Sequence, residues 1–324
     1  MERLIEKFET LIVGAGAAGA MAARTLVEAG RETRVIEALP RAGGRLQNAR
    51  MVAMCGGDLS FDHGGQFMTL RDPAFQVLAD QALADKALAP LGPVGTLKRG
   101  VWCPRESEPR FRGRPDMASF IAWLLRGVTV ETGTTLHSIT KRDGLYHLAT
   151  SKGEIAARSV ILAVTPAALM GLGFAGPGVR FDPCWAVSLA FDTPLKSQFE
   201  SFEIHDSALS WVARQPAWRD GERFGRDRWV LHLSAPWSAA NQSVPSDFVL
   251  DTARAAFAEA LCEEVPEPAF SFVQLWSEAK VAEPLGQLCF ALDDGLVACG
   301  DWCLDRRIEA ALLSGRAAAH SVLG

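Results

Sequence analysis

The stretch that decides the fold runs from residue 8 to residue 37 and reads FETLIVGAGAAGAMAARTLVEAGRETRVIE. It opens with a mainly apolar stretch, Phe8 to Val13, and continues into a glycine-rich turn. An alanine-rich run, Ala20 to Ala29, is typical of a helix and ends at a glycine suited to a C-cap. A β-branched strand, Thr33 to Ile36, follows and is closed by Glu37. This order of elements predicts a Rossmann-type dinucleotide-binding unit.

Three glycines of the turn have separate physical tasks. Gly14 permits the tight turn, Gly16 lets the backbone approach a pyrophosphate, and Gly19 lets the helix pack closely on the strand. The helix N-terminus then presents N–H groups and its positive dipole end to the phosphates. Glu37 stands where a carboxylate can accept hydrogen bonds from both ribose hydroxyls, which indicates a nucleotide with a free 2′-hydroxyl. The alternative is a merely structural glycine turn.

A second glycine loop, RAGGR at residues 41–45, follows the second strand directly. Gly43 and Gly44 let this loop pass beside a ligand, and Arg45 can form a bidentate contact with a phosphate. This loop therefore extends the predicted nucleotide site. The alternative is an exposed basic turn.

The C-terminal region carries a third candidate motif. Gly300 and Asp301 follow an apolar strand and precede a helix, and an aspartate there can hold a polyol hydroxyl. The helix that follows can direct its positive end at negative charge on a bound flavin ring. The alternative is a strand-end turn in which Asp301 only caps the helix.

The rest of the chain indicates a mixed α/β protein. Turn signals between alternating apolar runs predict a small β-meander that returns to a buried strand. We expect helices at Pro73–Ala89, Asp116–Arg126, Pro245–Glu264 and Ile308–Leu323, and strands at Val128–Val130, Thr134–Thr140, Leu145–Thr150, Val160–Val164, 184–192, 228–234 and Leu296–Cys299.

The motifs at the two ends of the chain are expected to complete one nucleotide-binding domain. We predict that this discontinuous domain comprises residues 1–75, 117–175 and 290–324. Residues 76–116 and 176–289 are predicted to form a substrate domain with a mixed sheet.

Composition narrows the classes of protein. The 324 residues carry 33 Lys and Arg against 38 Asp and Glu, a net charge of −5, which argues against a dedicated nucleic-acid binder. The one uncharged stretch that could span a bilayer, residues 159–179, is interrupted by glycines and prolines, so we expect no membrane segment. Seven cysteines without a CxxC pair indicate reduced thiols in a cytoplasmic protein and no metal site. They are Cys55, Cys103, Cys184, Cys262, Cys289, Cys299 and Cys303.

Several separate blocks of the sequence resemble the flavin-containing amine oxidase superfamily. They are GAGAAG at 14–19, Glu37, RAGGR at 41–45, DHGGQF at 62–67, ILAVTP at 161–166 and CGDW at 299–302 followed by RIEAALLSG. Four longer blocks closely resemble the bacterial renalase branch: PCWAVSLAFDTPL at 183–195, LSWVARQ at 209–215, WVLHLSAPWS at 229–238 and ACGDWCLDRRIEAALLSGRAAA at 298–319. The resemblance covers nearly the whole chain.

This resemblance implies a two-domain fold of the p-hydroxybenzoate hydroxylase type with tightly but non-covalently bound FAD. It also implies oxidation of the 2- and 6-dihydro isomers of NAD(P) to NAD(P)+, with O2 reoxidising the flavin to give hydrogen peroxide. Expected partners are therefore these small molecules. The sequence does not indicate an oligomeric state or the preferred isomer.

The family motifs carry residue roles over to matching positions. Expected cofactor contacts are Ala17, Glu37, Arg45, Gly65, Gln66, Leu136, Asp301, Arg307 and Ile308. Expected substrate contacts are Phe67, Met68, Thr69 and Arg71, with Cys184, Trp211, His232 and Trp302 as further pocket candidates.

Two positions depart from the family pattern. The turn reads GGQF where relatives often have GAQY, so the phenol hydroxyl is lost at Phe67. Cys184 stands where a hydroxyl residue is common, which weakens a hydrogen-bonding role there.

Hydride transfer explains why the motifs contain few acid–base groups. A dihydronicotinamide becomes aromatic on losing a hydride, so no catalytic base is required, and the protein supplies orientation and exclusion of water. His232 is the candidate catalytic side chain because it could orient the carboxamide, although a histidine in an apolar strand is often only structural. Arg71 could meet substrate phosphates or be a solvated surface residue.

Two other functions stay open. A true amine oxidase would favour an aromatic cage that often includes tyrosines, yet the single tyrosine, Tyr146, falls in the predicted meander. Phe and Trp could still build such a cage, and Lys280 could then position a water or be merely exposed. The second alternative is a flavin-binding protein without turnover.

Overall fold

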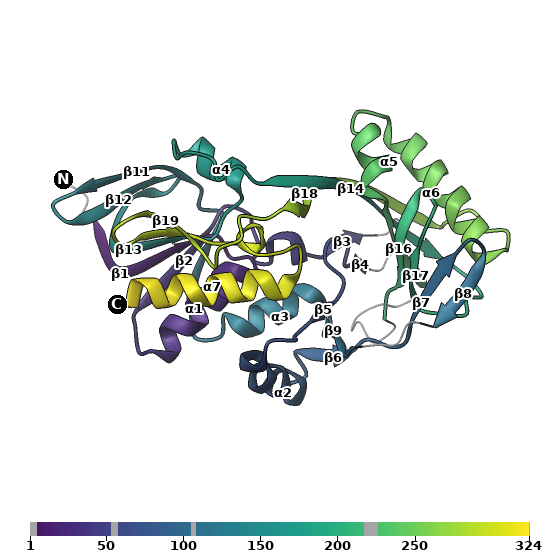
Figure 1. Cartoon of the computed structure of the whole chain (residues 1–324), viewed down its shortest axis with the longest axis horizontal. Coiled ribbons are helices and arrows are strands. Elements are labelled where there is room, and N and C mark those ends of the chain that lie inside the picture. Colours follow the sequence, from purple (N-terminus) through teal and green to yellow (C-terminus); the bar gives the residue numbers. More distant parts are fainter. Residues whose placement is uncertain (1–4, 53–57, 105–107, 217–225, 324) are drawn as a thin grey trace. The chain divides into compact units, whose positions relative to one another are not determined.

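A computed structural model describes residues 5–52, 58–104, 108–216 and 226–323 (Figure 1). The chain divides into two compact units. Unit 1 comprises Met1–Leu46, Ala118–Arg180 and Val281–Gly324, and unit 2 comprises Gln47–Met117 and Phe181–Lys280.

Unit 1 is built on an eight-stranded sheet. Its strands are β1 (Glu6–Val13), β2 (Thr33–Glu37), β10 (Thr129–Thr132), β11 (Leu136–Arg142), β12 (Leu145–Thr150), β13 (Gly153–Leu162), β19 (Phe290–Asp293) and β20 (Leu296–Ala298). The order is β10–β2–β1–β13–β12–β11, and β20 pairs with both β13 and β19. Strands β10, β2, β1, β13 and β20 pair in parallel, whereas β13, β12 and β11 form the expected antiparallel meander.

Helices α1 (Ala17–Glu28) and α7 (Ile308–Leu323) of unit 1 lie side by side on this sheet (Figure 1). The helices of unit 1 are α1 (Ala17–Glu28), α3 (Met117–Leu124, from Ala118 on), α4 (Pro166–Gly171) and α7 (Ile308–Leu323), with 3-10 turns η1 (Gly44–Leu46) and η3 (Asp301–Cys303). A Cβ atom added at Gly315 of α7 would lie 2.0 Å from the carbonyl oxygen of Ala18 in α1. Glycine is therefore required at 315 for the two helices to approach this closely.

Unit 2 contains a seven-stranded mixed sheet ordered β18–β14–β17–β16–β15–β7–β8. Its strands are β7 (Val94–Lys98), β8 (Val101–Pro104), β14 (Arg180–Phe191), β15 (Ser201–Ile204), β16 (Leu209–Arg214), β17 (Asp227–Leu233) and β18 (Phe270–Glu283). Only β15 and β7 pair in parallel among the registers described. In β17 every residue from Asp227 to Leu233 is buried.

Helices α5 (Ala235–Ala240) and α6 (Ser246–Leu261) complete the core of unit 2. Trp229 of β17 packs against Phe257 of α6 with ring centroids 5.2 Å apart, and Phe202 belongs to the same cluster. Smaller elements of this unit are the hairpin β3 (Ala49–Val52) and β4 (Asp58–Phe61), the three-stranded sheet β5 (Met68–Thr69), β9 (Arg110–Gly113) and β6 (Leu88–Pro90), the 3-10 turn η2 (Pro73–Phe75) and α2 (Gln76–Ala84).

These elements confirm the predicted α/β class, with a parallel sheet, a meander and a mixed-sheet second unit. The helix expected at Pro73–Ala89 is shorter and ends at Ala84. It does not continue because Lys86 has a left-handed φ of 57°. Strands β7, β8 and β9 lie in a Gly-, Pro- and Arg-rich stretch whose weak periodicity gave no strand prediction.

The division into units differs from the predicted domains chiefly at three segments, of which residues 47–75 are the longest; residues 176–180 and 281–289, predicted in the substrate domain, belong to unit 1. Residues 47–75 belong to unit 2, whereas the sequence prediction assigned residues 1–75 to the nucleotide-binding domain. The reason is tertiary: β5 pairs with β9, and Asp62 donates a backbone hydrogen bond to Gln215. The assignment of functions to the two domains stays a prediction.

Among the described helices, none combines the length and the apolar character of a membrane span. Six cysteines are free thiols in the described residues, and Cys55 lies outside them. The described residues also contain no cluster of His, Cys, Asp and Glu side chains arranged to hold a metal ion.

The contact between α1 and α7 gives a first prediction. Replacing Gly315 with Ala forces a methyl group against the Ala18 carbonyl and is expected to lower the free energy of unfolding by about 1–3 kcal/mol. Gly171→Ala is the matched control in the same unit, because no atom lies within 4 Å of its added Cβ. Denaturant titration of both variants measures the effect, and equal midpoints for the two would contradict this packing.

Candidate functional site

The glycine turn after β1 is held by close backbone packing. Gly14 has a φ of +101°, and a Cβ atom there would lie 2.4 Å from the carbonyl oxygen of Ala163. A Cβ atom at Gly19 would lie 1.9 Å from the Gly14 oxygen. The Gly14 N–H donates to the Ile36 carbonyl at 2.8 Å, which connects the turn to β2. Only glycines fit both positions, as the fingerprint predicts.

The second glycine loop lies against the first. The Gly43 N–H donates to the Ala15 carbonyl at 2.9 Å, and a Cβ atom at Gly44 would lie 3.3 Å from the Cα atom of Gly16. No side chain of the described residues caps the N-terminus of α1, and its first turn, from Ala17, contains no acidic residue. Uncapped N–H groups beside two glycine backbones form a cradle that suits a phosphate group.

Glu37, at the end of β2, is buried beside this cradle. Its carboxylate accepts hydrogen bonds from the backbone N–H groups of Ala15 (2.7 Å) and Leu39 (2.9 Å). Each oxygen keeps a further lone pair for a hydroxyl donor, because an ionised carboxylate offers about four acceptor positions. The side chain is therefore oriented by the loop and still able to bind ribose.

The N-terminal and C-terminal motifs meet within unit 1. Arg45 and Asp301 form an ion pair at 2.5 Å, and Asp301 also accepts the backbone N–H of Trp302 at 3.0 Å. Asp301 is buried, so the partner guanidinium offsets the cost of desolvating its charge. The two side chains predicted to meet a phosphate and a polyol are thus direct neighbours.

Other predicted cofactor residues of unit 1 have structural partners. Arg307 forms ion pairs with Asp305 at 2.6 Å and with Glu309 at 3.4 Å, so the first turn of α7 already contains a carboxylate. Ile308 begins α7, as predicted, and Leu136 is the half-buried first residue of β11.

Trp302 is a packing residue in this structure. It is 1% exposed, its indole N–H donates to the Val164 carbonyl at 3.0 Å, and its ring contacts Phe290 edge-on. A Cβ atom at Gly300 would lie 2.4 Å from its indole nitrogen, which explains the glycine there. The substrate role of Trp302 stays a prediction.

The residues of unit 1 fit the nucleotide part of FAD. The cradle between the glycine loops suits the pyrophosphate, Glu37 suits the ribose hydroxyls, and the Arg45–Asp301 pair suits the adjoining phosphate and ribityl groups.

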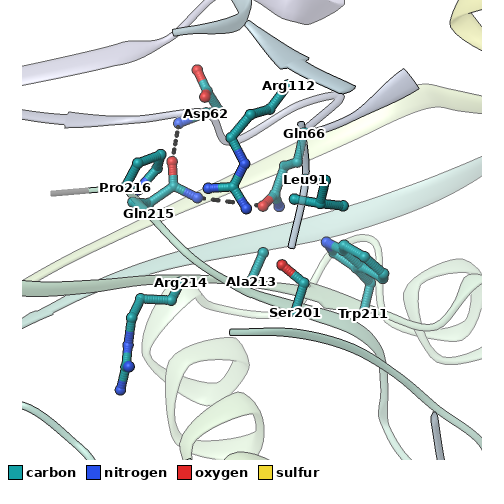
Figure 2. Close-up of a pocket in the computed structure, with 10 residues that line it drawn as sticks. All are labelled: Asp62, Gln66, Leu91, Arg112, Ser201, Trp211, Ala213, Arg214, Gln215 and Pro216. Atoms are coloured by element: carbon teal, nitrogen blue, oxygen red, sulfur yellow. Dashed lines mark hydrogen bonds between the residues drawn. The ribbon is translucent and has the colours of Figure 1, made fainter. Parts of the chain in front are cut away.

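In unit 2, the turn after β4 places Gln66 in a buried chain of hydrogen bonds (Figure 2). The Asp62 N–H donates to Gln215 Oε1 at 3.0 Å, and Gln215 Nε2 donates to Gln66 Oε1 at 3.3 Å. Gln66 Nε2 then lies 3.3 Å from His232 Nε2. Gly65 is the half-buried residue before Gln66.

His232 is a neutral imidazole at ordinary pH. Burial and, to a smaller extent, the positive charge of Lys280 together lower its pKa from the usual 6.5 to about 3. The His63 carbonyl oxygen, 3.2 Å from Nε2, favours a proton on the ring and opposes this shift only in part. His232 can therefore donate or accept a hydrogen bond but does not supply a charge.

Aromatic side chains line the neighbouring space. Phe67 packs on Trp211 with ring centroids 4.9 Å apart, and the Arg110 guanidinium lies 5.5 Å from the Phe67 centroid. Trp211 and Gln66 border a cavity of about 10 Å³ (Figure 2). The buried indole N–H of Trp211 and the Ser201 hydroxyl have no partner among the described residues, so the cavity is polar and large enough for about one water molecule.

The remaining predicted substrate residues differ in their surroundings. Met68 and Thr69 are buried in β5, and Arg71 forms an exposed ion pair with Glu108. Burial raises the pKa of the Cys184 thiol to about 11, and its Sγ lies 3.5 Å from the Leu233 carbonyl. Cys184 is therefore a protonated, internally bonded thiol.

Three residues of the network that includes His232 are not predicted from the sequence. Gln215 anchors the hydrogen-bonded chain, and His63 stacks on Trp276 with ring centroids 5.0 Å apart. The Trp276 indole N–H donates to the His63 carbonyl at 3.2 Å. Gln215 ends the LSWVARQ block and His63 lies in DHGGQF, so the resemblance marks both segments, but no local spacing signals the contacts.

The role of Glu37 leads to a binding prediction. Glu37→Gln removes the charge from a hydroxyl acceptor and is expected to weaken binding of the expected FAD about 10- to 100-fold. Quenching of flavin fluorescence on titration into apoprotein measures this change. The exposed Glu32→Gln variant is the control, and equal affinity of both variants would contradict the ribose role.

The burial of His232 predicts a pH dependence of stability. Between pH 6.5 and about 3 the unfolded chain binds a proton at this imidazole and the folded chain does not, so stability falls as the pH falls. His232→Asn removes this contribution, and the wild type is expected to lose up to about 1.4 kcal/mol per pH unit more than this variant. Denaturant titrations from pH 7 to pH 4 test it, with the exposed His320→Asn as control. Parallel curves for wild type and His232→Asn would refute it.

Comparison with known proteins identifies the family and the fold. Residues 12–82 match the family model of the NAD(P)-binding Rossmann-like domain, and residues 113–323 match that of the flavin containing amine oxidoreductases. Cyclohexylamine oxidase from Brevibacterium oxydans has a similar fold, with a TM-score of 0.75 and 11% identity over 97% of this chain and 98% of that one.

Two further solved structures have the same fold. Wild-type putrescine oxidase bound to putrescine gives a TM-score of 0.67 and 13% identity over 98% of this chain and 99% of that one. An oxidoreductase from Methanosarcina mazei gives 0.70 and 14% identity over 96% and 99%. Because the second family model covers more than half of the sequence, this chain belongs to the flavin containing amine oxidoreductases, and its cofactor is FAD.

Proposed function

We propose that this chain is an FAD-dependent oxidase of isomeric dihydronicotinamide dinucleotides. Its substrates would be the 2- and 6-dihydro forms of NAD(P), its product NAD(P)+, and O2 would be reduced to hydrogen peroxide. The bound FAD supplies the acceptor for a hydride and returns the electrons to O2.

The observation that carries this proposal is the neutral, hydrogen-bonded state of His232. A dihydronicotinamide loses only a hydride, so the protein has to orient the ring and exclude water without supplying a base. A buried neutral imidazole can hold a carboxamide without being a competing charge. Gln66, packed beside it, is held by its own hydrogen bonds.

Cofactor contacts are proposed for the residues of unit 1 described above. Glu37 would accept the ribose hydroxyls, the N-terminus of α1 would meet the pyrophosphate, and Asp301 would bind the ribityl chain. In unit 2, Phe67 and Trp211 would present aromatic faces to the substrate. Arg71 would reach a substrate phosphate only by exchanging its partner Glu108.

Sequence blocks support the choice of substrate. The segments that resemble bacterial renalases, LSWVARQ and WVLHLSAPWS, cover β16 and most of β17, which carry Trp211 and His232. The hydroxyl of Tyr146, the single tyrosine, donates to Asp293 and to the Asp294 carbonyl in unit 1. This hydroxyl therefore has a structural role in joining the meander to β19.

Amine oxidation is the second candidate. The family as a whole and the solved amine oxidases of the same fold favour it, as does the aromatic pair Phe67–Trp211, which could border an amine. A flavin-binding protein without turnover is the third alternative.

Anaerobic stopped-flow mixing tests the three functions together. We expect 2- or 6-dihydro-NAD(P) to bleach the visible flavin absorbance rapidly and amines such as putrescine and cyclohexylamine to leave it unchanged. Ordinary 1,4-dihydro-NAD(P) is the control for nonspecific reduction. Bleaching by amines alone would replace the proposal with amine oxidation, and no bleaching by either class would favour the protein without turnover.

A further inference from the structure

The hydrogen-bonded chain that ends at His232 has a direction set by the backbone. The Asp62 N–H can only donate, so Gln215 must turn its oxygen toward it. Gln215 then presents its NH2 group to Gln66, which must accept through Oε1. All three residues are buried, so a reversed Gln215 amide would leave its NH2 group facing the Asp62 N–H, which is unfavourable.

This direction reaches the imidazole. Because Gln66 uses its oxygen for Gln215, its NH2 group faces His232 Nε2 at 3.3 Å. A donor at that distance requires an unprotonated Nε2, so the ring proton lies on Nδ1.

A competing contact gives the opposite preference. The His63 carbonyl oxygen is 3.2 Å from the same Nε2 and would accept a proton there. That oxygen already accepts the Trp276 indole N–H, so it is satisfied without His232. Protonating Nε2 would force Gln66 and Gln215 to rotate their amides and would place the Gln215 NH2 group against the Asp62 N–H. The anchor at Gln215 therefore decides between two otherwise accessible tautomers.

We propose that Gln215 is a positioning residue that holds His232 in the Nδ1–H tautomer, so that His232 meets its substrate as a hydrogen-bond donor. This inference rests on the proposed function. Among the described residues, no acceptor contacts Nδ1 of His232, which leaves its N–H for a ligand.

The tautomer also specifies what His232 can recognise. An Nδ1–H group donates a hydrogen bond to a carbonyl oxygen, such as that of a nicotinamide carboxamide. It cannot form a hydrogen bond with another N–H donor. The positive charge of Lys280, which His232 senses, also disfavours an ammonium group at this place. Both features favour a carboxamide-bearing substrate over a protonated amine.

Nitrogen NMR of the FAD-loaded full chain tests the tautomer directly. In protein labelled with ¹⁵N-histidine, long-range ¹H–¹⁵N spectra distinguish protonated from unprotonated ring nitrogens, and the His232→Asn variant identifies the signals of His232. We expect a protonated Nδ1 and an unprotonated Nε2 in the wild type at neutral pH. A protonated Nε2 in the wild type overturns the proposal.

Two variants then test the anchor. Gln215→Leu frees Gln66 to rotate, and Gln66→Leu removes the amide, so in both we expect the proton to move to Nε2 and bond the His63 carbonyl. Gln242→Leu is the matched control, because Gln242 lies outside this chain of hydrogen bonds and donates to Ala239. An Nδ1–H tautomer that persists in both test variants overturns the role of Gln215.

Activity gives a separate readout. Loss of one substrate hydrogen bond predicts that Gln215→Leu lowers kcat/KM for the dihydronicotinamide about tenfold, mainly through KM, with Gln242→Leu unchanged. If neither dihydro isomer reduces the flavin while the tautomers behave as expected, the substrate assignment fails and the positioning by Gln215 stands. If the dihydro isomers reduce the flavin but His232 has its proton on Nε2, the substrate assignment stands and the positioning role of Gln215 fails.

Discussion

The nucleotide-binding turn of unit 1 depends on close backbone packing that leaves no room for a side chain at Gly14 or Gly19. The turn after β1 passes so close to the end of β13 that a Cβ atom at Gly14 would lie 2.4 Å from the Ala163 oxygen, and α1 starts so close to the turn that Gly19 is equally restricted. This contact places the N-terminus of α1 beside Gly44, and Glu37 is held there by the N–H of Ala15. The cradle for phosphate and the acceptor for ribose are therefore consequences of one backbone packing constraint.

Unit 2 obeys a different constraint, the need of buried polar groups for correctly directed partners. The fixed donor at Asp62 orients Gln215, which orients Gln66, which meets His232. Aromatic packing of Phe67 on Trp211 borders the same network, and the burial that makes its hydrogen bonds directional also keeps His232 neutral. Rigidity and chemistry at this site thus have the same origin.

In a flavin oxidase that accepts a hydride, fixing the orientation of the substrate is more important than supplying a proton acceptor. Under the proposed function, the neutral imidazole of His232 and the fixed amide of Gln66 would meet that need. Dihydronicotinamides and amines make different demands, because the former offer a carbonyl oxygen and the latter a nitrogen that is protonated in water. The direction of a hydrogen bond at His232 is consequently a feature on which the two substrate classes differ.

The sequence by itself determined the local backbone elements: the glycine turn with its helix and acidic residue, the meander, and the helix that begins at Ile308. It also determined the family and the FAD cofactor through motifs within short stretches. Tertiary structure alone decided that residues 47–75 join unit 2, that Arg45 pairs with Asp301, and that Gln215 reaches Gln66. The physical reason is range. A turn or a helix is set by neighbouring residues whose steric limits are visible in order, whereas a hydrogen bond between residues far apart in the chain depends on strand register and packing that no local pattern records.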